Sequence, residues 1–216
     1  MKILITAATQ FELDALSSRW CEDSEKIHTI DLLVTGLGSV ATAYNLTKAL
    51  SDEFYDLALN IGIAGSFSGN YPIGSVVGVR YDCFADLGVA EESGFKTAFD
   101  MNLLLPNSRP FTDGWLSCPY LDRYPTLSHI PKVKAVTVNT VTGTDKRAEE
   151  LKNLFSPDIE GMEGAAFFYV CISENVPFLQ IRSVSNMVGE RNKSKWNIPL
   201  ALDNLGIALE NLPFSI

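Results

Sequence analysis

The chain has 216 residues, of which 46% are hydrophobic and 20% are charged, and its formal net charge is −9 at pH 7. This composition predicts a globular protein with one domain, residues 1–216, that is large enough for a full hydrophobic core. The acidic balance argues against a nucleic acid or an anionic membrane as the main partner.

The N-terminal stretch MKILITAATQFELD is too polar for a signal peptide, and no later stretch approaches the ~18 apolar residues of a membrane span. The four cysteines are scattered without CxxC spacing, and the chain has only two histidines. We therefore expect no membrane anchor, no metal site and no disulfide framework. Reduced thiols in a cytoplasmic protein are the simplest interpretation.

The first part of the chain alternates β-type runs with helical patterns. Strand patterns cover residues 2–6 and 27–35, and helical patterns cover residues 10–20 and 38–50. Glu12 follows the first strand, at the sheet edge where ligands bind in open α/β folds. The competing interpretation of Glu12 is a carboxylate that only stabilises the start of a helix.

Two glycine-containing segments follow strands in this region. Residues 36–41, GLGSVA, match the spacing of a dinucleotide-binding loop, but the next strand, 57–61, carries Asn60 where an acid would bind the ribose. A tight strand-to-helix turn explains these glycines better. We expect the strand to end in a loop where Gly62 and Gly65 let backbone amides approach a ligand closely.

The second part of the chain contains one long stretch without a periodic pattern. Residues 82–131 are rich in proline and aromatic residues, which is typical of a binding loop or a subunit contact. Thr144 or Asp145 is the expected N-cap of the helix that follows. Further strand patterns cover residues 73–81, 132–139, 158–160 and 176–185, and helical patterns cover residues 146–155, 164–170 and 196–212. Strands separated by helices argue for an α/β three-layer sandwich.

Three charged residues stand in otherwise apolar surroundings. Glu160 and Glu163 precede a helix that is rich in small residues, and carboxylates at that position suit the helix dipole. The alternative for Glu163 is a carboxylate that points into a pocket. Arg182 lies within an apolar strand, and a buried guanidinium is expected to need carboxylate partners.

Six motifs in the same order make nearly the whole chain resemble the purine nucleoside phosphorylase and nucleosidase superfamily. They are Glu12 after the first strand, residues 36–38 (GLG), residues 60–65 (NIGIAG) with 73–77 (IGSVV), residues 142–145 (TGTD), residues 161–166 (GMEGAA) and residues 182–186 (RSVSN). Within the superfamily, the stretches DIEGMEGAAFFYVC and QIRSVSNMVGERN are most similar to the futalosine hydrolase family.

The resemblance implies a central mixed, barrel-like sheet flanked by helices, a homodimer or larger homo-oligomer, and a small purine nucleoside as substrate without a cofactor. It implies that Glu163 binds the ribose hydroxyls, that Met162 packs against the sugar, and that Glu12 activates the attacking water as general base. Arg182 would organise these carboxylates and the water. The implied catalytic residues are Glu12 and Asn186, and the implied substrate-binding residues are Met162, Glu163, Arg182, Ala64 and Gly65.

Asn186 is the expected selector of the purine base. Family members that act on 6-aminopurine thioethers carry aspartate here, whereas an asparagine amide can donate a hydrogen bond to a purine O6 or N7. A hypoxanthine-type base therefore fits Asn186 better than adenine. The competing interpretation is an asparagine that caps the chain after the strand. Ile63 replaces a serine of the methylthioadenosine branch, so that a water contact is missing or replaced.

The segment around Glu12, ITAATQFELDAL, has no arginine and no Gly-Asp-Pro-type phosphate loop, which favours hydrolysis over phosphorolysis. The resemblance therefore implies hydrolysis of futalosine to hypoxanthine and dehypoxanthinyl futalosine, a step of menaquinone biosynthesis. The alternatives are a methylthioadenosine/S-adenosylhomocysteine nucleosidase, a 6-oxopurine nucleoside phosphorylase and a purine-binding module without catalysis. We expect residues 82–131 to contact the aryl carboxylate of futalosine.

Overall fold

The computed structural model describes residues 1–14, 28–92 and 94–210. Its strands are β1 (Lys2–Ala7), β2 (Thr29–Val34), β3 (Leu57–Ser66), β4 (Val76–Asp82), β5 (Gly88–Glu91), β6 (Gly94–Thr97), β7 (Leu116–Ser117), β8 (Lys132–Thr137), β9 (Ile159–Gly161) and β10 (Phe178–Met187). Its helices are α2 (Gly38–Asp52), α3 (Asp145–Phe155), α4 (Gly164–Glu174) and α5 (Ile198–Glu210), with the short 3-10 helices η1 (Pro119–Arg123), η2 (Pro125–Leu127) and η3 (Lys193–Lys195).

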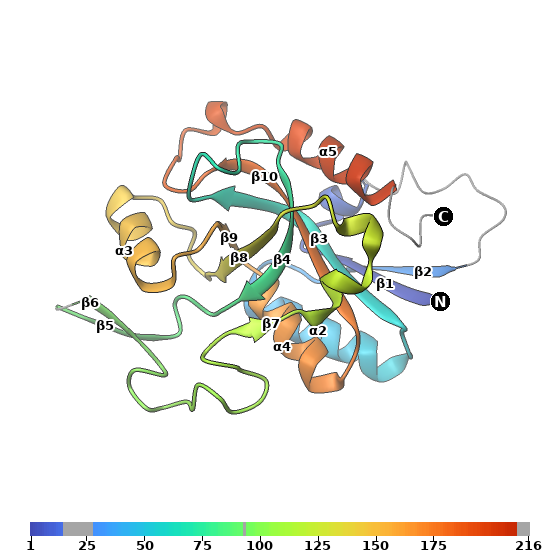
Figure 1. Ribbon diagram of the computed structural model, residues 1–216, viewed down its shortest axis with the longest axis horizontal. Coiled ribbons are helices and arrows are strands. Elements are labelled where there is room, and N and C mark those ends of the chain that lie inside the picture. Colours follow the sequence, from blue (N-terminus) through green and yellow to red (C-terminus); the bar gives the residue numbers. More distant parts are fainter. Residues whose placement is uncertain (15–27, 93, 211–216) are drawn as a thin grey trace.

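The central sheet closes on itself. Strands β10, β4, β8, β9 and β3 pair in this order, and β10 also pairs with β3, while β1 and β2 extend from β3 (Figure 1). Strand β3 is parallel to β1 and β10 and antiparallel to β9. The expected mixed, barrel-like sheet is therefore confirmed within the described residues.

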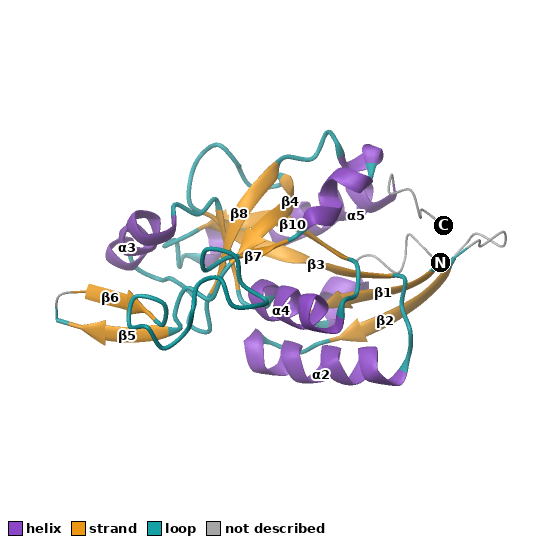
Figure 2. Ribbon diagram, turned by 60° about the horizontal axis from the view of Figure 1, so that its bottom comes forward, coloured by secondary structure: helices purple, strands orange, loops and turns teal. Residues whose placement is uncertain are grey.

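Helices cover two opposite sides of this sheet. Helices α2 and α4 pack together on one side, and α5 covers β10 on the other (Figure 2). Residues 164–168 of α4 are all buried because this helix lies between α2 and the sheet. The layers confirm the expected α/β sandwich. None of the described helices is long and apolar enough to cross a membrane.

Strand β3 is longer than expected. The prediction that a loop begins at Gly62 is wrong, because the strand continues to Ser66. Its first half pairs with β1 and its last two residues pair with β9 along the same edge, while β10 pairs along the other edge. These partners satisfy the backbone groups that a loop would expose. The change of partner from β1 to β9 leaves an opening beside the middle of β3.

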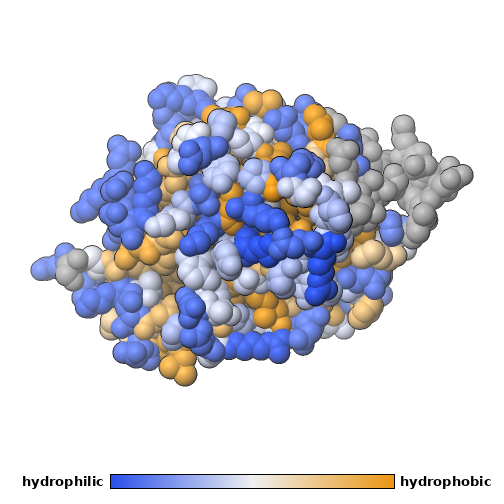
Figure 3. Space-filling model, viewed as in Figure 1, coloured by the Kyte–Doolittle hydropathy of each residue, from blue (hydrophilic) through white to orange (hydrophobic). Residues whose placement is uncertain are grey.

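The expectation of an irregular segment at residues 82–131 is wrong in part. This segment forms the hairpin β5–β6, the short strand β7 and the turns η1 and η2. The hairpin projects from one end of the molecule (Figure 2). Hydrophilic residues cover most of the face that carries η1 and η2, with smaller apolar patches between them (Figure 3).

The helix expected at residues 10–20 begins as predicted, with residues 10–14 helical, and the remainder lies outside the described residues. The last two residues of the helix expected at 196–212 also lie outside them. Thr144 is the N-cap of α3, and its side chain accepts a hydrogen bond from the Arg147 amide, which confirms the first of the two predicted caps.

Candidate active site

A cavity of about 330 Å³ opens where β3 changes partner from β1 to β9. This position is a topological switch point, where α/β proteins commonly bind ligands. Strands β3, β9 and β10 and the segments around them supply its walls. The predicted site residues that line it are Glu12, Ala64, Gly65, Met162, Glu163 and Asn186.

Glu12 is held by a capping box. The Thr9 hydroxyl accepts a hydrogen bond from the Glu12 amide at 3.3 Å, and Glu12 Oε2 accepts from the Thr9 amide at 3.1 Å and the Thr9 hydroxyl at 2.8 Å. This reciprocal pairing is typical of Thr-x-x-Glu at a helix start. The helix-start role and the predicted site role therefore occur in the same carboxylate, which is 8% exposed.

The second oxygen of Glu12 faces β3. The amide of Ile63 donates a hydrogen bond to Glu12 Oε1 at 3.3 Å. Residue 63, which lacks the serine hydroxyl of the methylthioadenosine branch, therefore contacts this carboxylate through its backbone. A Cβ atom on Gly62 would lie 2.7 Å from the same oxygen. Only glycine at this position leaves room for the observed carboxylate.

Glu163 lies at the start of α4 but caps a different helix. Its side chain makes no cap bond within α4, and its Oε1 accepts from the Gly38 amide, at the start of α2, at 2.9 Å. A carboxylate at a helix N-terminus is stabilised by the helix dipole. Burial raises the pKa of Glu163, and the charge of Glu12 raises it further, while the Gly38 amide and Arg182 oppose the rise.

Arg182 lies behind the cavity wall, outside its lining. Its guanidinium donates to the side-chain oxygen of Asn60 and to the Ile181 carbonyl, and no ion pair joins it to a described carboxylate. The expectation of direct carboxylate partners is therefore wrong. Burial lowers the pKa of Arg182, while the charges of Glu163 and Glu12 raise it from a longer distance.

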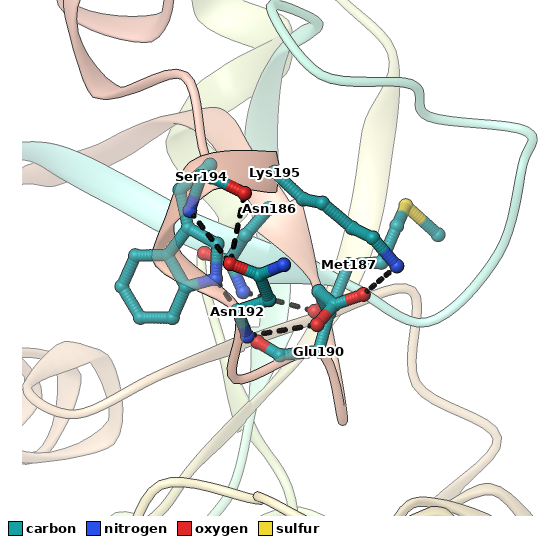
Figure 4. A network of polar contacts seen from close by, with 7 residues as sticks. Asn186, Met187, Glu190, Asn192, Ser194 and Lys195 are labelled. Atoms are coloured by element: carbon teal, nitrogen blue, oxygen red, sulfur yellow. Dashed lines mark hydrogen bonds and ion pairs between the residues drawn. The ribbon is translucent and has the colours of Figure 1, made fainter.

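Asn186, on β10, lies at the other end of the cavity. It pairs with Gly65 of β3, which is three residues beyond Gly62. Its Oδ1 accepts from the Ser185 hydroxyl at 2.8 Å, and its Nδ2 donates to the Met187 carbonyl at 3.0 Å. These partners fix the amide plane. In the segment after β10, the Glu190 carboxylate accepts from the Asn192 amide at 2.8 Å and from the Lys195 ammonium at 2.5 Å (Figure 4).

Glu160 shares this end of the cavity, although no role for it was predicted from the sequence motifs. It is 6% exposed, and its Oε1 accepts from the Thr142 amide at 2.9 Å. Its Oε2 and the Thr142 hydroxyl lie outside hydrogen-bond geometry with any described group. Burial raises the pKa of Glu160, while the nearby Thr142 hydroxyl and amide lower it.

Residues 82–131 do not contribute to the lining within the described chain. The expectation that they contact the aryl carboxylate of futalosine therefore stays a prediction. The lining near Glu12 instead includes Phe11 and Leu37, which are 62% and 66% exposed. An apolar rim of this kind fits an aryl group.

The arrangement divides the cavity into two chemical ends. Two carboxylates, Glu12 and Glu163, lie at the first end, where they can stabilise positive charge and accept a proton. Asn186 and Glu160 lie at the second end, where they can hydrogen-bond a polar ring. Sequence reasoning missed Thr9, although the Thr-x-x-Glu spacing was available as a signal.

The comparisons with known proteins agree with this geometry. The model of the phosphorylase superfamily matches residues 2–212. A futalosine hydrolase of Acidothermus cellulolyticus is 33% identical over 223 residues, covering 95% of this chain and 87% of that protein. A futalosine hydrolase of Streptomyces coelicolor is 30% identical over 229 residues, covering 98% of this chain and 95% of that protein.

The solved structure of futalosine hydrolase from Helicobacter pylori superposes with a TM-score of 0.81 at 18% identity, covering 98% of this chain and 96% of that chain. This match shows the fold, and the two sequence matches show the family. The chain belongs to the phosphorylase superfamily and, within it, to the futalosine hydrolase family.

Proposed function

We propose that this chain is an N-glycosyl hydrolase that cleaves futalosine into hypoxanthine and dehypoxanthinyl futalosine in menaquinone biosynthesis. The observation that carries the proposal is the placement of Glu12 and Glu163 at one end of a cavity whose other end has Asn186. Each group then faces the part of a purine nucleoside that its chemistry suits. Family membership supports the same substrate.

The mechanism follows from the charge that develops during cleavage. N-ribosidic cleavage makes the sugar cation-like and the leaving purine negative, so groups that stabilise these charges lower the barrier. Glu163 binds the ribose hydroxyls and stabilises the positive sugar, with Met162 packed against it. Glu12 takes a proton from water that attacks the anomeric carbon. The Asn186 amide donates to O6 or N7 of the departing hypoxanthine.

The lining favours water over phosphate as the nucleophile. It contains Glu12, Glu160 and Glu163, and no lysine or arginine among the described residues that form it. Phosphate recognition needs cationic or amide donors, and a phosphate beside these carboxylates would be repelled. Arg182 lies behind the wall, where we propose that it positions the site through its long-range attraction to Glu12 and Glu163.

The test is incubation of the purified protein with futalosine, inosine and methylthioadenosine in parallel, with and without phosphate, while free base is measured. We expect hypoxanthine release from futalosine without phosphate. Adenine release from methylthioadenosine as the fastest reaction would favour the methylthioadenosine nucleosidase alternative. Phosphate-dependent release from inosine would favour a phosphorylase, and tight purine binding without any release would favour a binding module.

We also propose that the chain forms a homo-oligomer through α2. The α2 side chains of Val40 and Tyr44 are 83% and 68% exposed. Val40 borders an apolar groove that Phe84 and Tyr169 also line. Light scattering of the purified protein should give at least twice the chain mass, and Val40→Glu should reduce it to one chain. Leu154→Glu, at an exposed leucine on α3, is the control.

The cytoplasm is the compartment we propose for this chain. Cys83, Cys118 and Cys171 are buried free thiols. Buried reduced thiols fit a reducing compartment. Fractionation of cells that produce the protein would place it in the cytoplasm, and recovery from another fraction would contradict the proposal.

A further inference from the structure

A second polar residue faces Asn186 across the cavity. Residue Gly65 of β3 pairs with Asn186 on one side and with Glu160 on the other. Neighbouring residues in register point to the same face of a sheet, so that both side chains can meet a ligand between them. The two Cα atoms are separated by two strand spacings, on the order of 10 Å.

The space between these side chains depends on Gly65. A Cβ atom there would lie 3.0 Å from the Val188 side chain and 3.2 Å from Asn186 Nδ2. A glycine therefore leaves room for Val188 and for the Asn186 amide against β3. The cavity that Glu160 and Asn186 line has room for a planar purine ring, which can form hydrogen bonds with both side chains.

Glu160 has an oxygen available for such a bond. Its Oε1 is engaged by the Thr142 amide, whereas its Oε2 is buried without a hydrogen-bond partner among the described residues. Burying a polar atom without a partner is unfavourable, so an unpaired carboxylate oxygen on a residue that lines the cavity calls for a donor from the ligand.

The two purine classes differ in what they offer at this position. A 6-oxopurine carries a hydrogen on N1, next to the O6 acceptor, whereas adenine N1 is an acceptor. An ionised carboxylate only accepts hydrogen bonds. It therefore pairs with the N1–H of hypoxanthine and repels the N1 lone pair of adenine.

We propose that Glu160 is a specificity-determining residue that accepts the N1–H of the 6-oxopurine, while Asn186 donates to O6 or N7 of the same base. This inference rests on the proposed function, because it assumes that the base occupies the end of the cavity near Gly65. Glu160 and Asn186, which pair with Gly65 from its two sides, would then select the base together.

The test compares Glu160→Gln with the wild type. The glutamine oxygen can keep the bond to the Thr142 amide, and its NH₂ group then replaces Oε2 and faces N1 as a donor. The substrates are futalosine and the analogue that carries adenine in place of hypoxanthine. We expect the ratio of their kcat/KM values to fall by roughly 10- to 100-fold in favour of the adenine analogue.

Binding of the free bases supplies a second measurement that does not depend on catalysis. Wild type should bind hypoxanthine at least about 10-fold more tightly than 1-methylhypoxanthine, whose N1 has no hydrogen, and Glu160→Gln should reduce this difference. Glu149→Gln removes the same charge from an exposed position on α3 and should change neither ratio. Thermal unfolding checks that each variant is folded.

A folded Glu160→Gln protein with unchanged substrate and base ratios would overturn the inference, as would an equal loss on both nucleosides. If wild type releases no base, the proposed function fails, whereas base binding that still depends on Glu160 would support the specificity role. The two hypotheses can therefore fail separately.

Discussion

The carboxylate of Glu12 lies against the backbone of Gly62, where a Cβ atom would be 2.7 Å from Oε1. Because Oε1 also accepts from the Ile63 amide, β3 and the capping box hold the carboxylate from two sides. The position of the proposed base is thus set by the absence of a side chain on the neighbouring strand.

Replacing Gly62 by alanine should displace this carboxylate. We expect kcat for futalosine to fall by roughly 10²-fold, because small displacements of a catalytic group carry penalties of that size. The measurement is steady-state hypoxanthine release. Gly69→Ala is the matched control, because a Cβ atom there meets no neighbour within 4 Å. Equal activities for the two variants would contradict the positioning role.

Removing the Thr9 hydroxyl should loosen Glu12 without removing it. Thr9→Val loses the side-chain half of the capping box, and we expect kcat to fall about 10-fold and stability to fall by about 1 kcal/mol. Thr144→Val removes the side-chain cap of α3, at a residue outside the cavity lining. This control should lose similar stability and keep full activity, so a parallel loss of activity in both variants would contradict the prediction.

Asn186→Asp should change the base preference. An aspartate cannot donate to O6, and it would face the Met187 carbonyl that Nδ2 contacts now. We expect hypoxanthine release to fall about 10-fold or more, while adenine release from methylthioadenosine rises. Asn70→Asp, in an exposed turn, serves as the control. Unchanged selectivity in Asn186→Asp would show that this amide does not contact the base.

A buried carboxyl beneath α4 should make stability depend on pH. Asp82 accepts from Thr137 and Gln180, and burial raises its pKa to about 7. Because the folded pKa exceeds the unfolded value of about 3.9, the folded state favours the proton, and this stabilisation is lost as pH rises through about 7.

Asp82→Asn should remove this pH dependence. The wild-type urea midpoint should fall between pH 5 and pH 8, and the midpoint of the variant should fall less over the same range. A steeper fall in Asp82→Asn than in wild type would contradict the raised pKa. Because Thr137 also accepts from the Ala165 amide at the start of α4, the same cluster supports the helix that follows Glu163.

The sequence motifs predicted the residues that line the cavity better than they predicted the strand pairings that position those residues. Glu12 follows β1 and Asn186 lies near the end of β10, and parallel strands end at the same edge of the sheet, so motif position predicted that these two residues line one cavity. Glu163 reaches the same cavity differently, because it follows β9, which is antiparallel to β3. The long β3 could not be predicted, since residues 62–66 become a strand only through pairing with β9 and β10.

Long-range contacts explain the other differences. The bond between Arg182 and Asn60 joins residues more than a hundred positions apart, and no local pattern signals that an amide would replace a carboxylate partner. The sequence pattern at Glu160 is that of a carboxylate that stabilises a helix start, next to Glu163. Its relation to Asn186 depends on the register of β9 and β10 against Gly65, which the sequence does not reveal.

The central claim is that Glu12 activates water at this cavity to cleave futalosine. The most direct test is turnover in ¹⁸O-labelled water without phosphate, with wild type and Glu12→Gln in parallel. Wild type should release hypoxanthine and place one ¹⁸O atom on the sugar product, and folded Glu12→Gln should lose about 10²-fold or more of this rate. Wild-type-like turnover in Glu12→Gln, or a sugar product without the label, would contradict the account.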